Sequence, residues 1–133
     1  MTTSDFKTQL RSLIDLQRTP YTKERIPDAA TRRDRLMRAA TMLAQVSDAI
    51  AVAVSEDFGH RGAEQTRFET FGAANAFRKA AANVENWMQP SRHPALAPDA
   101  EARVEHIPLG VIGVMGPWNG EAFRKFLSAA IAG

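Results

Sequence analysis

The chain has 133 residues, of which 44% are hydrophobic and 24% charged, a composition that excludes a disordered segment and is typical of a globular domain. Its net charge of +2 is too small to mark the whole chain as a binder of polyanions. The sequence contains no cysteine, which excludes disulfides, cysteine-ligated metals and a cysteine nucleophile within these residues.

The first predicted element is a helix from about Ser4 to Gln17. Ser4 is suited to the N-cap, and the negative charge of Asp5 favours the positive end of the helix dipole. We expect the helix to end at Thr19-Pro20, because the residue before a proline is disfavoured in the helical region. One apolar face is formed by Phe6, Leu10, Leu13 and Ile14.

A second helical region begins near Asp28, directly after Pro27. Ser47-Asp48 can act as a new N-cap that splits this region into two helices. The DFG sequence at 57–59 predicts its end, since Gly59 suits a left-handed C-terminal cap. Its predicted core stripe consists of Leu36, Ala40, Leu43, Ile50 and Val54.

The third predicted helix runs from Ala63 to Met88, and Pro90 follows its end. Its core stripe is aromatic at one end and rich in alanine in the middle, which permits close packing of helices there. The stripe consists of Phe68, Phe71, Ala74, Phe77, Ala81, Val84 and either Trp87 or Met88.

The pattern changes after the third helix. Residues 89–100 contain three prolines and predict an extended linker. EARVEHI at 101–107 favours a short strand, and LGVIGVMG at 109–116 favours a strand buried on both faces. The sequence therefore predicts a mainly α fold, helical over 4–88, with a short C-terminal β-strand pair over 101–116.

Three glycines lie at 110, 113 and 116, but this spacing does not match the G-x-G-x-x-G fingerprint of dinucleotide binding. In a core strand, such glycines allow another backbone to approach closely. Pro117-Trp118-Asn119 follows them. The amide of Asn119 has two interpretations: a donor to a developing oxyanion, or a local hydrogen bond within a turn.

His60, His93 and His106 are widely separated and lack metal-ligand spacing, so we predict no metal site. His60 is expected to cap carbonyls at a helix end, and Glu56 and Asp57 to be helix-end charges rather than a catalytic pair.

Four arginines at 32, 33, 35 and 38 form a basic segment, which either binds nucleic acid or forms a solvent-facing helix face. We favour the helix face, because no aromatic residues are interleaved, and we predict no nucleic-acid partner.

The N-terminal sequence MTTSDFKTQL lacks the apolar core of a signal peptide. The longest aliphatic run, AIAVAV at 49–54, is far shorter than the ~20 residues that cross a bilayer. We therefore expect a cytoplasmic protein without membrane contact.

Three motifs in order carry a resemblance to a known family: DFGHR at 57–61, WMQPSR at 87–92, and PLGVIGVMGPWN at 108–119. With them, the chain from about Thr19 to Asn119 resembles the N-terminal portion of an aldehyde dehydrogenase, in its coniferyl aldehyde dehydrogenase-like branch. The resemblance implies that residues 1–119 are an incomplete piece of the α/β aldehyde dehydrogenase fold.

The resemblance also implies NAD(P)-dependent oxidation of an aldehyde to a carboxylic acid. In this family a cysteine thiolate attacks the aldehyde, a hydride passes to the cofactor, and a glutamate-activated water releases the acid. The resemblance assigns Asn119 to holding the oxyanion, and Gly116, Pro117 and Trp118 to lining the cofactor site.

The resemblance implies a departure from the family pattern after Asn119: we expect residues 120–133 to be a divergent tail, with Glu121, Arg124 and Lys125 where the family has apolar residues. A truncated or frame-shifted copy is our leading explanation. We expect no dehydrogenase activity and no tight binding of NAD or NADP by this chain alone.

The alternative is a helical interaction module that associates with a full-length family member or with itself. The predicted strand at 109–116 would then offer its edge to another chain, and its unpaired apolar faces would lower solubility.

Overall fold

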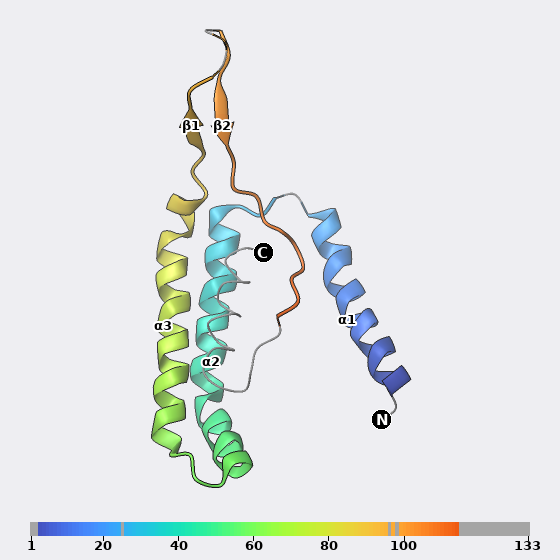
Figure 1. The fold of residues 1–133 in the computed structure, drawn as a ribbon, viewed down its shortest axis with the longest axis vertical. Helices are drawn as coiled ribbons and strands as arrows, with labels where there is room; N and C mark the ends of the chain where they lie inside the picture. Colours follow the sequence, from blue (N-terminus) through green and yellow to red (C-terminus); the bar gives the residue numbers. More distant parts are fainter. Residues whose placement is uncertain (1–2, 25, 96, 98, 115–133) are drawn as a thin grey trace.

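The computed structural model describes residues 3–24, 26–95, 97 and 99–114. It contains three helices, α1 (Thr3–Lys23), α2 (Ala29–Phe58) and α3 (Ala63–Trp87), followed by the strands β1 (Ser91–His93) and β2 (Ala102–Val104). Figure 1 shows α2 and α3 side by side, with the β1–β2 hairpin projecting beyond one end and α1 standing apart. The mainly α fold with a short strand pair is as predicted.

The core lies between α2 and α3. From α2 it receives Leu36, Ala40 and Leu43, and from α3 it receives Ala74, Phe77, Ala80, Ala81 and Val84. Phe77 is fully buried, surrounded by small side chains that allow the two helices to approach closely. The alanine-rich centre of the predicted stripe is therefore confirmed.

The aromatic end of the predicted α3 stripe is wrong. Phe68 is 77% exposed and Phe71 is 62% exposed. At this end α3 instead turns Thr66 and Thr70 inward, and the Thr70 hydroxyl lies 2.6 Å from the Ser47 hydroxyl of α2. This bond offsets the cost of burying the Thr70 hydroxyl, whereas the buried Thr66 hydroxyl has no hydrogen-bond partner among the described groups.

The predicted break at Ser47-Asp48 is also wrong, because α2 is continuous from Ala29 to Phe58. Both side chains face α3: Ser47 pairs with Thr70, and a carboxylate oxygen of Asp48 accepts from the Nε of Arg67 at 2.7 Å. Side chains committed to interhelical partners do not cap a new helix.

The ends of α2 follow the prediction. The Asp28 carboxylate accepts from the Thr31 N–H at 2.7 Å as the N-cap. Gly59 has φ 70°, and its N–H donates to the Ser55 carbonyl at 2.8 Å. This left-handed backbone is the conformation for which glycine carries no steric penalty.

Helix α1 extends six residues beyond the predicted Gln17 and contains Pro20. A proline inside a helix removes one N–H donor, which normally ends the helix. No residue of α1 is buried, so the carbonyl that loses this donor, on the highly exposed Leu16, remains accessible to water. The exposure of α1 thus makes Pro20 tolerable.

The strand pair differs from the predicted one. β1 lies inside the predicted linker at 89–100, and it pairs antiparallel with β2, with Arg92 opposite Arg103. The described part of the predicted strand at 109–116, residues 109–114, forms no strand. A strand buried on both faces needs neighbours, and in the described chain β1 and β2 pair only with each other.

Helix α2 is long and apolar enough, by length and composition alone, to cross a membrane. Its longest uninterrupted aliphatic run is the short AIAVAV stretch at 49–54. Core helices of soluble proteins meet the same criterion, and α2 buries Leu36, Ala40 and Leu43 against α3. The absence of membrane contact therefore stays a prediction.

The Asp28 cap gives a testable pH dependence. Hydrogen bonds from the Thr31 side chain and backbone lower the pKa of Asp28 from its ordinary value of 3.8. The cap's stabilisation is therefore present above pH 3.8 and is lost as the pH falls through the lower pKa of the folded state. We expect Asp28→Ala to lower the thermal midpoint at neutral pH, measured by circular dichroism.

Asp28→Asn is the matched control for this prediction, because asparagine caps a helix without titrating in this range. It should hold the midpoint near that of the parent at neutral pH and remove the acid-dependent component. An Asp28→Ala variant with the parent's midpoint at every pH would contradict the capping role.

Candidate functional site

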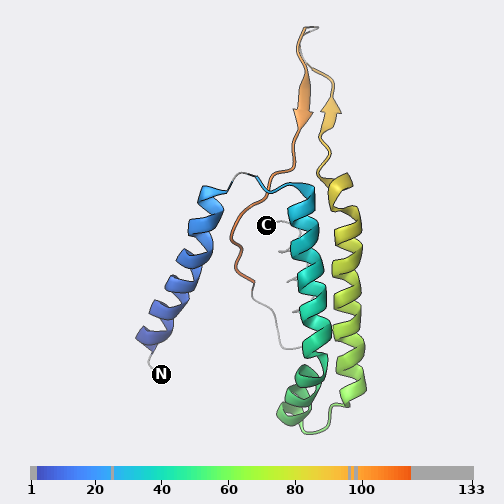
Figure 2. The ribbon, with the colours of Figure 1, turned by 180° about the vertical axis from the view of Figure 1, so that it is seen from behind.

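The residues assigned to catalysis and cofactor binding, Asn119 and Gly116, Pro117 and Trp118, lie outside the described residues. The structure describes the segment that leads into them, residues 105–114. After β2 this segment crosses the end of α2 and runs between α2 and α1, as both Figure 1 and Figure 2 show. The described part of the candidate site is therefore this segment and the residues that contact it.

One contact joins α1 to this segment. The hydroxyl of Tyr21 donates a hydrogen bond of 3.1 Å to the carbonyl of Pro108, which is buried. Two residues later, Gly110 has φ 91°. A Cβ added at Gly110 would lie 2.8 Å from Cε1 of the Tyr21 ring, so glycine is required both by the backbone and by the ring.

The predicted role of the glycines is thus changed at Gly110, where an aromatic side chain approaches rather than another backbone. A Cβ added at Gly113 would meet no atom of the described residues within 4 Å, so none of them explains that glycine by a close approach. Gly116 lies outside the described residues. Sequence reasoning missed Tyr21, because a contact between residues 87 positions apart leaves no periodic signal.

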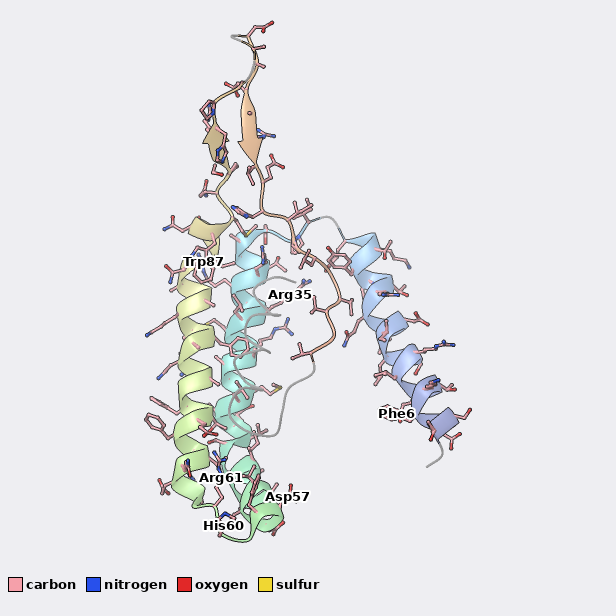
Figure 3. All side chains as sticks on the ribbon, viewed as in Figure 1. Phe6, Arg35, Asp57, His60, Arg61 and Trp87 are labelled. Carbon is pink, nitrogen blue, oxygen red and sulfur yellow. The ribbon has the colours of Figure 1, made fainter. Side chains whose placement is uncertain are left out.

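A groove of about 640 Å³ lies beside this segment, at the end of the α2–α3 pair where Figure 3 labels Trp87. It combines apolar walls with a guanidinium, a carboxylate and an imidazole. Burial, followed by the nearby charge of Arg35, lowers the pKa of Arg32 in its wall. The lining residues are Arg32, Val84, Asn86, Trp87, Met88, Gln89, Glu105, His106, Ile107 and Leu109.

The DFGHR turn lies at the opposite end of the pair, where Figure 3 labels Asp57, His60 and Arg61. Arg61 forms a 2.6 Å ion pair with Glu69, and their side chains are only 16% and 30% exposed. The His60 ring packs edge-on against Phe58, with centroids 6.3 Å apart, while the Gly59 N–H caps the helix. This motif joins α2 to α3 at the end of the pair opposite to Trp87.

The histidines are distributed over three places: the DFGHR turn, β1 and the groove. In the part of the chain that the structure describes, no three His, Asp or Glu side chains come together as metal ligands. The His93 Nε2 lies 3.1 Å from the Ser91 hydroxyl on the same strand.

The basic segment of α2 is largely paired with carboxylates. Arg33 contacts Glu85 of α3 at 2.7 Å, and Arg35 contacts Glu24 at 2.8 Å. Arg38 pairs with Asp34 one turn earlier, at 2.9 Å. This arrangement supports the helix-face interpretation for these three arginines, whereas Arg32 is buried and does not belong to the solvent-facing side. The absence of a nucleic-acid partner remains a prediction.

Comparison with known proteins identifies the class. The model of the aldehyde dehydrogenase family matches residues 9–133. The chain therefore belongs to the aldehyde dehydrogenase family, whose members generally use NAD(P), and the resemblance carried by the three motifs is confirmed.

Within the family, the chain is similar to coniferyl aldehyde dehydrogenases. It is 42% identical over 112 residues to the coniferyl aldehyde dehydrogenase of Pseudomonas sp. strain HR199, covering 84% of this chain and 23% of that protein. It is 34% identical over 129 residues to a probable coniferyl aldehyde dehydrogenase of Pseudomonas aeruginosa, covering 93% and 27% respectively. No solved structure matches. The chain spans about a quarter of the length of these curated relatives.

Proposed function

We propose that this sequence corresponds to the N-terminal part of a cytoplasmic, NAD(P)-dependent dehydrogenase that oxidises aromatic aldehydes of the coniferyl type. The observation that carries the proposal is the 42% identity to a coniferyl aldehyde dehydrogenase over 84% of the chain. The motifs ending in PLGVIGVMGPWN, in order along the sequence, support it further.

In this proposal Asn119 contributes the side-chain amide that donates to the oxyanion formed from the aldehyde oxygen. Gly116, Pro117 and Trp118 would line the cofactor site, where NAD(P) would supply the hydride acceptor. The nucleophile must come from outside these residues, because the sequence contains no cysteine. In this proposal, Asn119 thus supplies one hydrogen-bond donor to the oxyanion, and the cysteine nucleophile comes from outside these residues.

We accordingly expect this chain alone to produce no NADH or NADPH from coniferyl aldehyde. The measurement is absorbance of the reduced cofactor, with the complete Pseudomonas HR199 enzyme as positive control. Reduction above the no-protein background would contradict the expected inactivity of the chain.

A chimera tests the assigned role of Asn119. Residues 1–119 of this chain are joined to the part of the Pseudomonas HR199 enzyme that follows its matching segment, which restores a nucleophile. We expect this chimera to oxidise coniferyl aldehyde, and Asn119→Ala to lower kcat by roughly 10²–10³-fold, as loss of one oxyanion donor does. Asn83→Ala, which removes an exposed amide from α3, is the matched control.

The second candidate function is a helical interaction module that associates with a full-length family member or with another copy. Its support is exposed apolar surface: Phe68 and Phe71 on α3, and the face of α1 that includes Phe6, Leu10 and Leu13. Figure 3 shows Phe6 near the free end of α1. Light scattering after size-exclusion chromatography, with and without the complete enzyme, tests this function by measuring molar mass. A chain that is monomeric alone and does not bind the complete enzyme would contradict it.

A further inference from the structure

We propose that Tyr21 is a positioning residue for the segment that carries Asn119. Its hydroxyl and ring together fix where residues 108–110 lie, shortly before Pro117 and Asn119 in the sequence. This inference rests on the proposed role of Asn119, but its test below does not.

Two separate features of Tyr21 act on the segment. The hydroxyl holds the carbonyl of Pro108 at 3.1 Å. The ring fills the space next to Gly110, where a Cβ would approach within 2.8 Å of Cε1 and 3.1 Å of Cζ. The bond fixes the segment along its length, and the ring accepts only glycine at position 110.

The end of α1 that carries Tyr21 is connected to α2 by an ion pair. It lies in the last turn of α1, where it is half-buried although no residue of that helix is fully buried. Three residues later, Glu24 forms a 2.8 Å ion pair with Arg35 of α2. An exposed pair of this kind contributes little energy, but it orients the end of α1 beside the first turns of α2. Tyr21 therefore links the helical pair to the segment.

The place of residues 108–110 matters because Asn119 follows Gly110 by only nine residues in the sequence. A donor to an oxyanion must lie about 2.7–3.2 Å from the oxygen, so a displacement of about 1 Å is enough to break such a bond. A residue that fixes residues 108–110 thus acts on the site without contacting substrate.

The test uses the full 133-residue chain. Tyr21→Phe removes the hydroxyl and keeps the ring, whereas Gly110→Ala places a Cβ against the ring. We expect Tyr21→Phe to raise amide exchange of the 107–114 segment by roughly fivefold, which is the effect of losing one hydrogen bond of ordinary strength. Gly110→Ala should raise it further. Thr22→Val, which removes a neighbouring hydroxyl bonded within α1, should leave this segment unchanged.

A second readout reports on the residue beside Asn119. The chain has two tryptophans, so Trp87→Phe leaves Trp118 as the sole tryptophan. In this background Tyr21→Phe and Gly110→Ala should change the emission maximum of Trp118 and its quenching by acrylamide. The thermal midpoint of unfolding of the α2–α3 pair should be the same in these variants as in the Thr22→Val control. A purely structural role for Tyr21 would lower the midpoint and leave the Trp118 emission unchanged in the folded state.

The ring contact is tested separately by combining substitutions. In a Tyr21→Ala background, Gly110→Ala should add less to the exchange rate than it does alone, because the ring that it strikes is gone. Two results would overturn the positioning role. One is that the effects of Tyr21→Ala and Gly110→Ala on the exchange rate are additive. The other is that neither Tyr21→Phe nor Gly110→Ala changes the emission of Trp118. Inactivity of the chimera with unchanged results here would instead refute the proposed function.

Discussion

Phe77→Ala is expected to lower the free energy of unfolding by about 3–5 kcal/mol, the cost of removing a buried phenylalanine side chain and leaving a cavity. Phe77 is fully buried, and it belongs to a core cluster rich in alanines, which are too short to fill the space that it would leave. Denaturant unfolding followed by circular dichroism measures the change.

The matched control for Phe77 is Phe71→Ala on the same helix, at a position 62% exposed. We expect this control to change stability by less than about 0.5 kcal/mol, as exposed substitutions do. If Phe77→Ala prevents folding, Val84→Ala gives a smaller loss in the same core and keeps the comparison possible. Equal losses at positions 71 and 77 would contradict the described packing of α3.

Arg61→Met is expected to lower the free energy of unfolding by about 1–3 kcal/mol, because it leaves the Glu69 carboxylate largely buried without its partner. The side chains of the Arg61–Glu69 pair are only 16% and 30% exposed. The same substitution at Arg38, whose pair with Asp34 is 70% and 65% exposed, should have little effect.

The Arg61–Glu69 pair can be isolated by a double-mutant cycle with Glu69→Gln. We expect the double variant to lose less stability than the sum of the single variants, because each single change leaves a buried polar group unmatched. The Nε of Arg61 is buried without a hydrogen-bond partner among the described groups, so part of its cost is already present in the parent. Strict additivity would show that the turn is held by other contacts.

Positions governed by local backbone chemistry were predictable from the sequence. Asp28 caps α2 and Gly59 ends it, as expected, because a carboxylate N-cap and a left-handed glycine act on their own helix turn. The stripe of Ala74, Phe77, Ala81 and Val84 was predictable from its spacing. The family was predictable because its motifs are sequence patterns, and the match over residues 9–133 confirms it.

The incorrect predictions concern positions whose structure depends on solvent exposure or on contacts with residues distant in the sequence. Phe68 and Phe71 fit a helical stripe, but at that end of α3 Thr66 and Thr70 are buried instead, and the Thr70 hydroxyl pairs with Ser47 of α2. Pro20 does not end α1, because the helix is exposed and water can replace the lost bond. The stretch 109–114 has the composition of a buried strand, but no strand in the described chain pairs with it.

The sequence by itself determined that the chain up to Trp87 is helical, the two caps of α2, the apolar centre of the core and the family, because each depends on residues close together in the chain or on a fixed motif. Only the tertiary structure decided which face of α3 is buried, that β1 and β2 pair with each other, and that Tyr21 meets Gly110. These contacts join residues far apart along the chain, and their energies depend on burial and partners that periodicity does not encode.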